Sequence, residues 1–414
     1  MLAARAKLAE YDTACDRLLS KLDLLLKVKS VTLAEKLAEE ALALKSVCEG
    51  LKTDSSLELW KLHLTELCEY IAVCSAAAPL PEASYSLMLT VWGCNRELIG
   101  EEKLRSEVRR AAAKYRRLAH VKSSLKEIPY REAIVVDEAR RILRELREVT
   151  TRHVVELPDD LDPPISVSPS YSGYVSGCFN TMKGILVINF TPGGTREELV
   201  SVIAHEVYPG HHVQRVFTSR ADLPATMKLN WVGRALRCST PVEEGLAQLA
   251  QRIAEEKLLE PEVAEYFKAR RELYSRARAL IDLLAHYYGM GEAEIRDELV
   301  KLGVPGEHAD NMLSTQATSC MDSAYYHGEM YVEWILEHAS PLLEDRELSW
   351  PLYKLLYTGY TTPYVKAAQV AKLLEEEHPE RARSLLERFE PTRPRYQKRR
   401  KRIEIIDPLL EEVF

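Results

Sequence analysis

Three of the eleven histidines in this chain of 414 residues lie within one stretch of eight residues, His-Glu-Val-Tyr-Pro-Gly-His-His, which begins at His205. Imidazoles gathered this closely most often hold a metal ion, usually zinc. Glu206 directly follows the first histidine, as does the carboxylate that acts as general base in zinc peptidases with the His-Glu-x-x-His motif. These residue types predict metal-dependent hydrolysis, with His205 as a metal ligand and Glu206 as the base.

The second ligand depends on the irregular spacing of this motif. In a His-Glu-x-x-His helix the second histidine is four residues after the first, where this chain has Pro209. On an ideal helix His211 would lie about 240° round from His205, and His212 would return to the same face about 10.5 Å along the axis. Pro209 cannot donate a helical hydrogen bond and the following glycine accepts unusual dihedrals, which predicts a bulged turn that aims a later histidine at the metal. We favour His211 as the second ligand, with His212 as a supporting residue or substrate contact; in the alternative, Pro-Gly ends the helix and the histidines cap it.

A capping signal places the first part of the motif on a helix. Thr195 follows the Thr-Pro-Gly-Gly turn of residues 191–194 and precedes Glu198 by three residues, which is the capping-box pattern. We therefore expect a helix from about Arg196, with His205 and Glu206 on its third turn.

A β-hairpin is predicted just before this helix. Segments 175–179 and 185–190 are rich in β-branched and other apolar residues and flank a turn at 182–184. This is the only convincing sheet signal in the sequence, and prolines spread through 157–172 exclude a long helix there. The edge of a strand beside a metal site is suited to pairing with an extended peptide substrate.

A third ligand is expected, because catalytic zinc sites take three protein ligands and a water. The start of a second predicted helix offers a candidate. Thr240 reads as an N-cap with Pro241 at the first helical position and Glu243 at the third. Glu243 then has a capping role, which leaves Glu244 able to point elsewhere, while Gly245 permits close approach of a neighbouring helix. We predict Glu244 as the third ligand; the alternative is a surface glutamate in a first helical turn.

These motifs resemble the domain-of-unknown-function family 885. The resemblance rests on His-Glu-x-x-Pro-Gly-His-His-x-Gln, from His205 to Gln214, and on Glu-Gly-x-Ala from Glu244, and it covers about residues 165–370. It extends more loosely through a further set of positions: Asn189, Arg276, Arg278, Asp282, His286, Tyr325 and Gly328. The chain departs from the family pattern at Leu246, where the family usually has Trp, and at residues 319–321, where it usually has Pro-Gly-Gln.

The family in turn resembles the gluzincin metallopeptidases, which bind zinc with two histidines and a downstream glutamate. The resemblance therefore implies a mostly helical metal-dependent hydrolase.

Four further residues are candidates for supporting roles. Asp282 and His286 are four residues apart in a helix predicted over 273–288, and an aspartate commonly orients a metal-binding histidine. We expect this pair to act as supporting residues or alternative ligands, unless it is a surface pair. Tyr325, or alternatively His327, is predicted to donate a hydrogen bond to the oxygen that becomes negative when a carbonyl is attacked. The alternative for these two residues is burial as aromatic side chains with satisfied polar groups.

Length and composition define the expected architecture. A chain of 47.1 kDa with 46% apolar residues is normal for a two-lobed enzyme. We expect a mostly α, two-lobed, metallopeptidase-like fold with a small antiparallel β-sheet next to the metal-binding helix. The predicted lobes are an N-terminal helical lobe (1–155), acting as a lid or wall, and a catalytic helical lobe (156–414) that contains the hairpin (165–192).

Composition also bears on partners and location. The net charge of −7 argues against nucleic acid as a partner, and no apolar run of about 18 residues indicates a membrane span. The N-terminus does not read as a signal peptide, so a cytoplasmic location is expected. The eight cysteines form no Cys-x-x-Cys pair and are expected to be buried, reduced thiols. Scarce asparagine with abundant charge is typical of thermophiles.

Together these observations predict a zinc-dependent hydrolase, with one zinc or another divalent metal per chain. Its expected substrate is a peptide or small amide, cleaved in a carboxypeptidase-like or oligopeptidase-like manner under a cover formed by the N-terminal helices. Two alternatives stay open: a helical scaffold or binding protein with a decayed site, suggested by Met321, and a metal-dependent amidase or esterase acting on non-peptide substrates.

Overall fold

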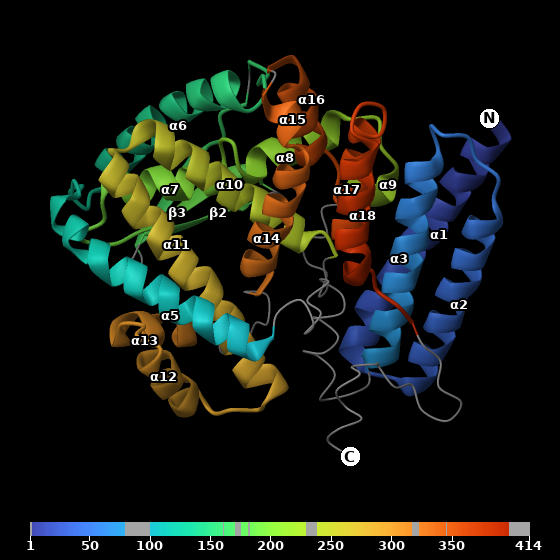
Figure 1. Cartoon of the computed structure of the whole chain (residues 1–414), viewed down its shortest axis with the longest axis horizontal. Helices are drawn as coiled ribbons and strands as arrows, with labels where there is room; N and C mark the ends of the chain where they lie inside the picture. Colours follow the sequence, from blue (N-terminus) through green and yellow to red (C-terminus); the bar gives the residue numbers. More distant parts are fainter. Residues whose placement is uncertain are drawn as a thin grey trace.

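The computed structural model is mostly helical with one small sheet in its described part, as predicted (Figure 1). It describes residues 2–78, 100–159, 161–169, 175–180, 183–228, 238–316, 323–344 and 346–396. Met321 and the side chain of His286, which figured in the sequence predictions, lie outside this part.

Three N-terminal helices form a bundle with its own core at one end of the molecule (Figure 1, blue). They are α1 (Leu2–Val28), α2 (Val31–Gly50) and α3 (Glu58–Ala77). The bundle packs on α9 (Ala225–Lys228) and α17 (Pro363–Leu374). The buried Asp12 of α1 accepts a hydrogen bond from the backbone N–H of Thr226 in α9 (3.2 Å), and Lys372 of α17 donates to the carbonyl of Ser55 (2.7 Å).

The next two helices join the body of the protein instead of this bundle. α5 (Glu101–Leu118), followed by a 3-10 turn (Ala119–Ser124), lies along α11 (Pro261–Asp282) in Figure 1. α6 (Glu132–His153) packs on α7 (Arg196–Glu206) and on the first strand. The division into lobes at residue 155 stays a prediction.

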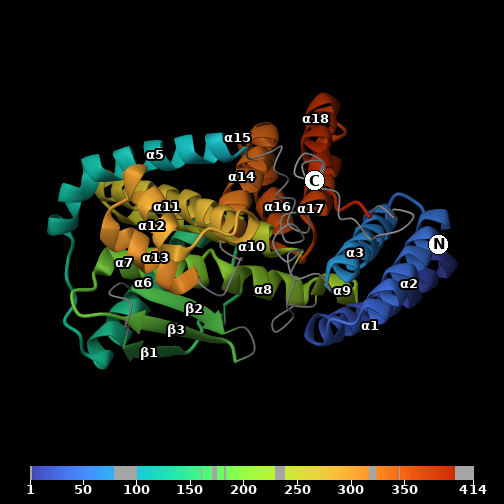
Figure 2. The same ribbon diagram turned by 90° about the horizontal axis from the view of Figure 1, so that it is seen from below.

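The sheet has three strands in the order β1-β3-β2 and lies beside α7 (Figure 2). The strands are β1 (Ile165–Pro169), β2 (Ser176–Asn180) and β3 (Ile185–Phe190). The predicted hairpin is present, since β2 pairs antiparallel with β3 through Cys178 opposite Val187. The sheet is mixed and not purely antiparallel, because β1 adds to the other side of β3 in parallel, with Ile165 opposite Leu186. Within the described ranges, β2 is therefore an edge strand.

Two helices in the centre of the body touch through their backbones. α10 (Thr240–Leu258) and α14 (Ser323–His338) cross where Gly245 meets Gly328. A Cβ atom on Gly245 would lie only 2.1 Å from the carbonyl oxygen of Gly328, so no larger residue fits at this crossing. The close approach predicted for Gly245 is confirmed, and it fixes the spacing of the two helices that carry Glu244 and Tyr325.

The remaining elements complete the body around α10, α11 and α14. α8 (His211–Arg220) follows α7, and a π turn (Leu283–Tyr287) leads from α11 to α12 (Glu292–Lys301) and α13 (Gly306–Gln316). The chain then forms α15 (Ser340–Glu344), α16 (Arg346–Tyr357), α18 (Pro379–Phe389) and a final 3-10 turn (Glu390–Thr392). No helix in the described ranges is long and apolar enough to span a membrane.

Most of the described cysteines agree with the expectation of buried, reduced thiols. Cys15, Cys48, Cys68, Cys74 and Cys238 are buried and unbridged. Cys178, on β2, is also unbridged but is exposed, which differs from the expectation.

Candidate metal centre

The helix that carries His205 begins at the predicted capping box. Thr195 Oγ1 accepts a hydrogen bond from the backbone N–H of Glu198 (3.2 Å), and the Glu198 carboxylate accepts one from the N–H of Thr195 (3.1 Å). α7 then runs to Glu206, with both His205 and Glu206 buried. The prediction of this helix and its N-cap is confirmed.

The turn after α7 differs from the predicted bulge within one helix. α7 ends at Glu206, Val207 makes a last helical N–H bond of 2.8 Å, and a new helix, α8, begins at His211. Gly210 permits the tight turn between them, because a Cβ there would lie 1.7 Å from the carbonyl oxygen of His205. The chain thus packs closely against the end of α7 at Gly210 and does not continue its helix.

This turn brings His211 close to His205 and directs His212 elsewhere. The rings of His205 and His211 meet edge to face, with centroids 4.8 Å apart. His212 Nε2 instead donates to the carbonyl of Leu161 (2.6 Å), and its ring packs 5.9 Å from the ring of Tyr208. His212 therefore anchors the segment that precedes the sheet, and the preference for His211 at the candidate metal site agrees with the geometry.

Helix α10 brings Glu244 to the same point. Its Oε2 lies 3.2 Å from Nε2 of His205 and 3.5 Å from Nε2 of His211. The candidate ligand atoms of the three residues all lie within 4.8 Å of one another. The start of α10 differs slightly from expectation: the N-cap is Ser239, one residue earlier than predicted, and its hydroxyl contacts the carboxylate of Glu243. The Glu243 carboxylate is thus hydrogen-bonded at the start of the helix, while the Glu244 carboxylate faces the histidines.

The spacing of these atoms fits a divalent metal ion. With metal–ligand bonds of about 2.0–2.2 Å, donors in a tetrahedral zinc site stand about 3.3–3.6 Å apart, and the two spacings to Glu244 Oε2 are 3.2 and 3.5 Å. Two imidazole nitrogens with one carboxylate oxygen also form one of the donor sets of catalytic zinc sites.

Two glutamines orient the imidazoles correctly for such a site. His205 Nδ1 lies 3.2 Å from Gln251 Oε1, and His211 Nδ1 lies 3.4 Å from Gln214 Oε1. Because an amide oxygen only accepts, each Nδ1 is the donor, which leaves each Nε2 with a lone pair on the side of Glu244. Metal-binding histidines are normally held in this way through their second nitrogen.

The electrostatics of the site favour a positive charge beside Glu244. Glu244 Oε2 is buried, and the polar atoms that face it are Nε2 of His205 and Nε2 of His211. Burial disfavours a charged His211, but the Glu244 carboxylate outweighs burial and raises the pKa of His211 to about 10. Burial likewise acts to raise the pKa of Glu244, but attraction to His211 and His205 holds that pKa well below its usual range. Without a metal ion, a proton on His211 lies beside the Glu244 carboxylate, and a divalent cation would displace that proton.

Gln251 was not foreseen from the sequence. Its amide nitrogen donates to Ser201 Oγ (3.0 Å), and Ser201 donates to Glu255 (2.9 Å), which pairs with Arg271 (2.7 Å). Seven residues separate Gln251 from Glu244, so two turns of α10 place them on one face. That spacing is the signal that could have identified Gln251 once Glu244 was proposed.

A cavity of about 320 Å³ opens beside His205 and Glu206. Its described lining comes from the start of β2 and from α7, α10, α11 and α14. None of the described residues of α1, α2, α3, α5 or α6 contributes to this lining. This differs from the expectation that the N-terminal helices cover the site, since α1 to α3 pack on α9 and α17 instead.

Tyr325 reaches the cavity from the first turn of α14. Its ring lies 6.1 Å from the ring of His205, centroid to centroid, and it forms part of the cavity lining. Asp282 holds the start of the same helix, because its carboxylate accepts a hydrogen bond from the backbone N–H of Ser323 (2.8 Å). Asp282 therefore supports the helix of Tyr325; its predicted pairing with His286 falls outside the described side chains.

His327, the alternative to Tyr325, lies inside the helical body. Its side chain is buried, its Nδ1 donates to the carbonyl of Ser323 (2.6 Å), and its ring contacts Tyr326 and Tyr331. Burial lowers the pKa of His327 to about 4. It is not among the described residues that line the cavity, whereas Tyr325 is.

The fold and this geometry define a helical protein with a candidate His-His-Glu metal site, of which His205 lines a cavity. The chain belongs to the family described as "Bacterial protein of unknown function (DUF885)", whose model matches residues 99–335. The resemblance to this family found in the sequence is thus confirmed.

A similar fold occurs in a crystal structure from Colwellia psychrerythraea, described as that of a putative lipoprotein. The two share 13% sequence identity with a TM-score of 0.57, over 86% of this chain and 69% of the other. This likeness concerns the fold alone. No curated protein matches the sequence.

Proposed function

We propose that the chain is a metal-dependent hydrolase that cleaves peptide bonds. The observation that carries this proposal is the convergence of His205, His211 and Glu244, with Glu206 beside His205 on the wall of a cavity. A base next to such a donor set is what metal-assisted hydrolysis requires. We further propose zinc as the metal, since this donor set is common for catalytic zinc.

The side chains divide the chemistry among them. A divalent cation held by the triad would supply positive charge that lowers the pKa of water and polarises a carbonyl group. Glu206 takes a proton from the attacking water and delivers it to the leaving nitrogen. The hydroxyl of Tyr325 donates a hydrogen bond to the carbonyl oxygen as negative charge develops on it.

The edge strand favours a peptide over a small amide as the substrate. Among the residues that the structure describes, β2 pairs with β3 on one side only, and Val175, Ser176 and Gly177 at its start form part of the cavity lining. An extended peptide can bind by adding a strand to such an edge, with its backbone hydrogen-bonded to β2. A small acyl amide has no extended backbone that could pair with this edge.

The substitution Glu206→Gln tests the role of the base. We expect the variant to bind metal like the parent protein but to lose turnover by about 10²- to 10⁴-fold, the usual contribution of general acid–base catalysis. Glu256→Gln, an exposed carboxylate on α10, is the matched control and should be fully active. Full activity in Glu206→Gln would remove this residue from the mechanism.

The substrate class is tested by comparing a peptide library with a panel of acyl amides and esters. The proposal predicts cleavage of peptides by the metal-loaded protein. Turnover of acyl amides or esters alone would favour a non-peptide hydrolase, and turnover of neither would favour a helical binding protein.

A further inference from the structure

One helix contributes most of the charge in the cavity. Three arginines of α11, Arg270, Arg271 and Arg278, line it, together with two carboxylates, Glu198 and Glu206. Positions 270, 274 and 278 of α11 are spaced by four residues and therefore share one face of the helix. The cavity thus presents more cationic than anionic side chains, although the chain as a whole is acidic.

Two of these arginines pair with carboxylates that stabilise α7, the helix that carries His205. Arg270 pairs with Glu198 (3.1 Å), the residue that completes the N-terminal cap of α7. Arg271 pairs with Glu255 through two hydrogen bonds of 2.7 and 2.8 Å, and Glu255 in turn accepts from Ser201 of α7. Both guanidinium groups therefore pair with carboxylates that stabilise α7 beside the cavity.

Arg278 lies close to two aromatic rings. Its guanidinium carbon lies 5.7 Å from the ring centroid of Tyr274 and 5.9 Å from that of Tyr325. Contacts of this kind orient a guanidinium group through its face and cost less desolvation than an ion pair. The Tyr325 ring is itself 6.1 Å from the ring of His205. These spacings place the Arg278 guanidinium within about 12 Å of His205, on the same cavity.

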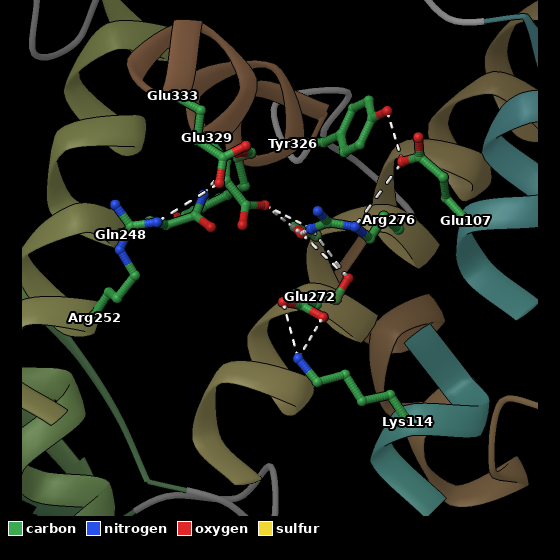
Figure 3. A network of polar contacts seen from close by, with 11 residues as sticks. Glu107, Lys114, Gln248, Arg252, Glu272, Arg276, Tyr326, Glu329 and Glu333 are labelled. Atoms are coloured by element: carbon green, nitrogen blue, oxygen red, sulfur yellow. Dashed lines mark hydrogen bonds and ion pairs between the residues drawn. The ribbon is translucent and has the colours of Figure 1, made fainter. Parts of the chain in front are cut away.

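Another arginine of α11, Arg276, has different surroundings. Arg276 points into a separate ionic network, where it pairs with Glu329 (2.6 Å) and lies 4.0 Å from Glu107 (Figure 3). Tyr326 also donates to Glu107 (2.8 Å) within this network. Arg276 is not among the described residues that line the cavity of the metal site. It therefore serves as a matched control for Arg278, two residues away on the same helix.

We propose that Arg278 binds the terminal carboxylate of the substrate, so that the protein removes residues from the carboxyl end of peptides. Arginine is the side chain best suited to a carboxylate, which it can bind through two parallel hydrogen bonds. An extended residue spans at most about 3.6 Å, so a guanidinium within about 12 Å of His205 suits a carboxylate one or two residues beyond the scissile bond. This inference rests on the peptidase function proposed above.

Two peptides of identical sequence, one with a free carboxyl end and one amidated, test the inference. We expect the metal-loaded parent to prefer the free acid by roughly 10- to 100-fold in kcat/KM, the range for a hydrogen bond to a charged group. Arg278→Gln should remove this preference, mainly by raising KM for the acid, so that the acid and the amide are cleaved about equally. Arg278→Lys should restore part of it, because lysine keeps the charge but cannot bind in a bidentate manner.

Because the preference is a ratio within one protein sample, a loss of stability does not imitate the expected result. Arg276→Gln, which breaks an ionic network elsewhere, should keep the preference of the parent. Equal cleavage of acid and amide by the parent would overturn the inference, and so would an undiminished preference in Arg278→Gln.

A binding measurement separates failure of this inference from failure of the peptidase function. The Glu206→Gln variant, loaded with zinc, is titrated calorimetrically with an N-acetylated dipeptide and with its amide. Tighter binding of the acid, lost when Arg278→Gln is added, supports the carboxylate site even if no peptide is turned over. Equal binding of acid and amide overturns the inference, whether or not the parent cleaves peptides.

Discussion

Replacing Gly245 by alanine tests how the site is assembled from two helices. The added Cβ would lie 2.1 Å from the carbonyl oxygen of Gly328, whereas real Cβ contacts are essentially never shorter than 3.0 Å. α10 and α14 must therefore separate by about 1 Å, and a gap of that size forfeits a quarter to a half of each van der Waals contact across the interface. Overpacking of this kind costs about 1–3 kcal/mol.

The consequences should appear in stability and in activity. For Gly245→Ala we expect the melting temperature to fall by roughly 1–4 °C, because the unfolding entropy of a chain of 414 residues makes 1 kcal/mol worth about 1 °C. Because α10 carries Glu244 and α14 carries Tyr325, a displacement of about 1 Å should also lower peptide hydrolysis by about 100-fold.

The assay is thermal unfolding followed by circular dichroism, together with kcat/KM on a cleavable peptide. Gly50→Ala is the control, since a Cβ there meets nothing within 4 Å, and it should melt at or above the temperature of the parent. A Gly245→Ala protein that melts at or above the temperature of the parent and keeps its activity would refute the tight crossing.

Two further predictions concern metal binding. Gln251→Ala removes the acceptor that holds Nδ1 of His205 and should weaken zinc binding by about 10- to 100-fold, measured by competition with a chromophoric chelator; unchanged affinity would show that Gln251 does not orient the ligand. Zinc affinity should also depend on pH, because the pKa of His211 is raised to about 10 by Glu244 and zinc must displace that proton. Below this pKa the apparent affinity should rise about tenfold for each unit of pH, with about one proton released per zinc in calorimetry; a flat profile between pH 6 and 8 would contradict the protonated His211.

Much of the site could be predicted because its signals are local in the chain. Thr195 and Glu198 form a capping box that fixes where α7 begins, so the positions of His205 and Glu206 follow from counting residues. The choice of Glu244 rested on Glu243 being engaged at the start of its helix, and the structure has that engagement, although through Ser239.

Other features depend on contacts between distant segments and left no clear local pattern. The stretch 165–169 lies among prolines that exclude a helix, but its pairing with β3 becomes evident only when the two segments lie side by side. The sequence at Pro209 and Gly210 favoured a bulged turn within one helix, whereas the structure has a complete break between α7 and α8. The break follows from packing, since Gly210 rests directly on the carbonyl of His205. Gln251 was missed because its partners come from a different helix.

The central claim is that His205, His211 and Glu244 bind a catalytic metal ion, and the metal content of the purified protein tests it most directly. Elemental mass spectrometry after zinc loading and removal of excess metal should find about one zinc per chain in the parent. His205→Ala and His211→Ala should lose this zinc, whereas His212→Ala should keep it, because His212 is bonded to the carbonyl of Leu161. A parent without bound metal, or a His211→Ala protein that retains it fully, would contradict the account.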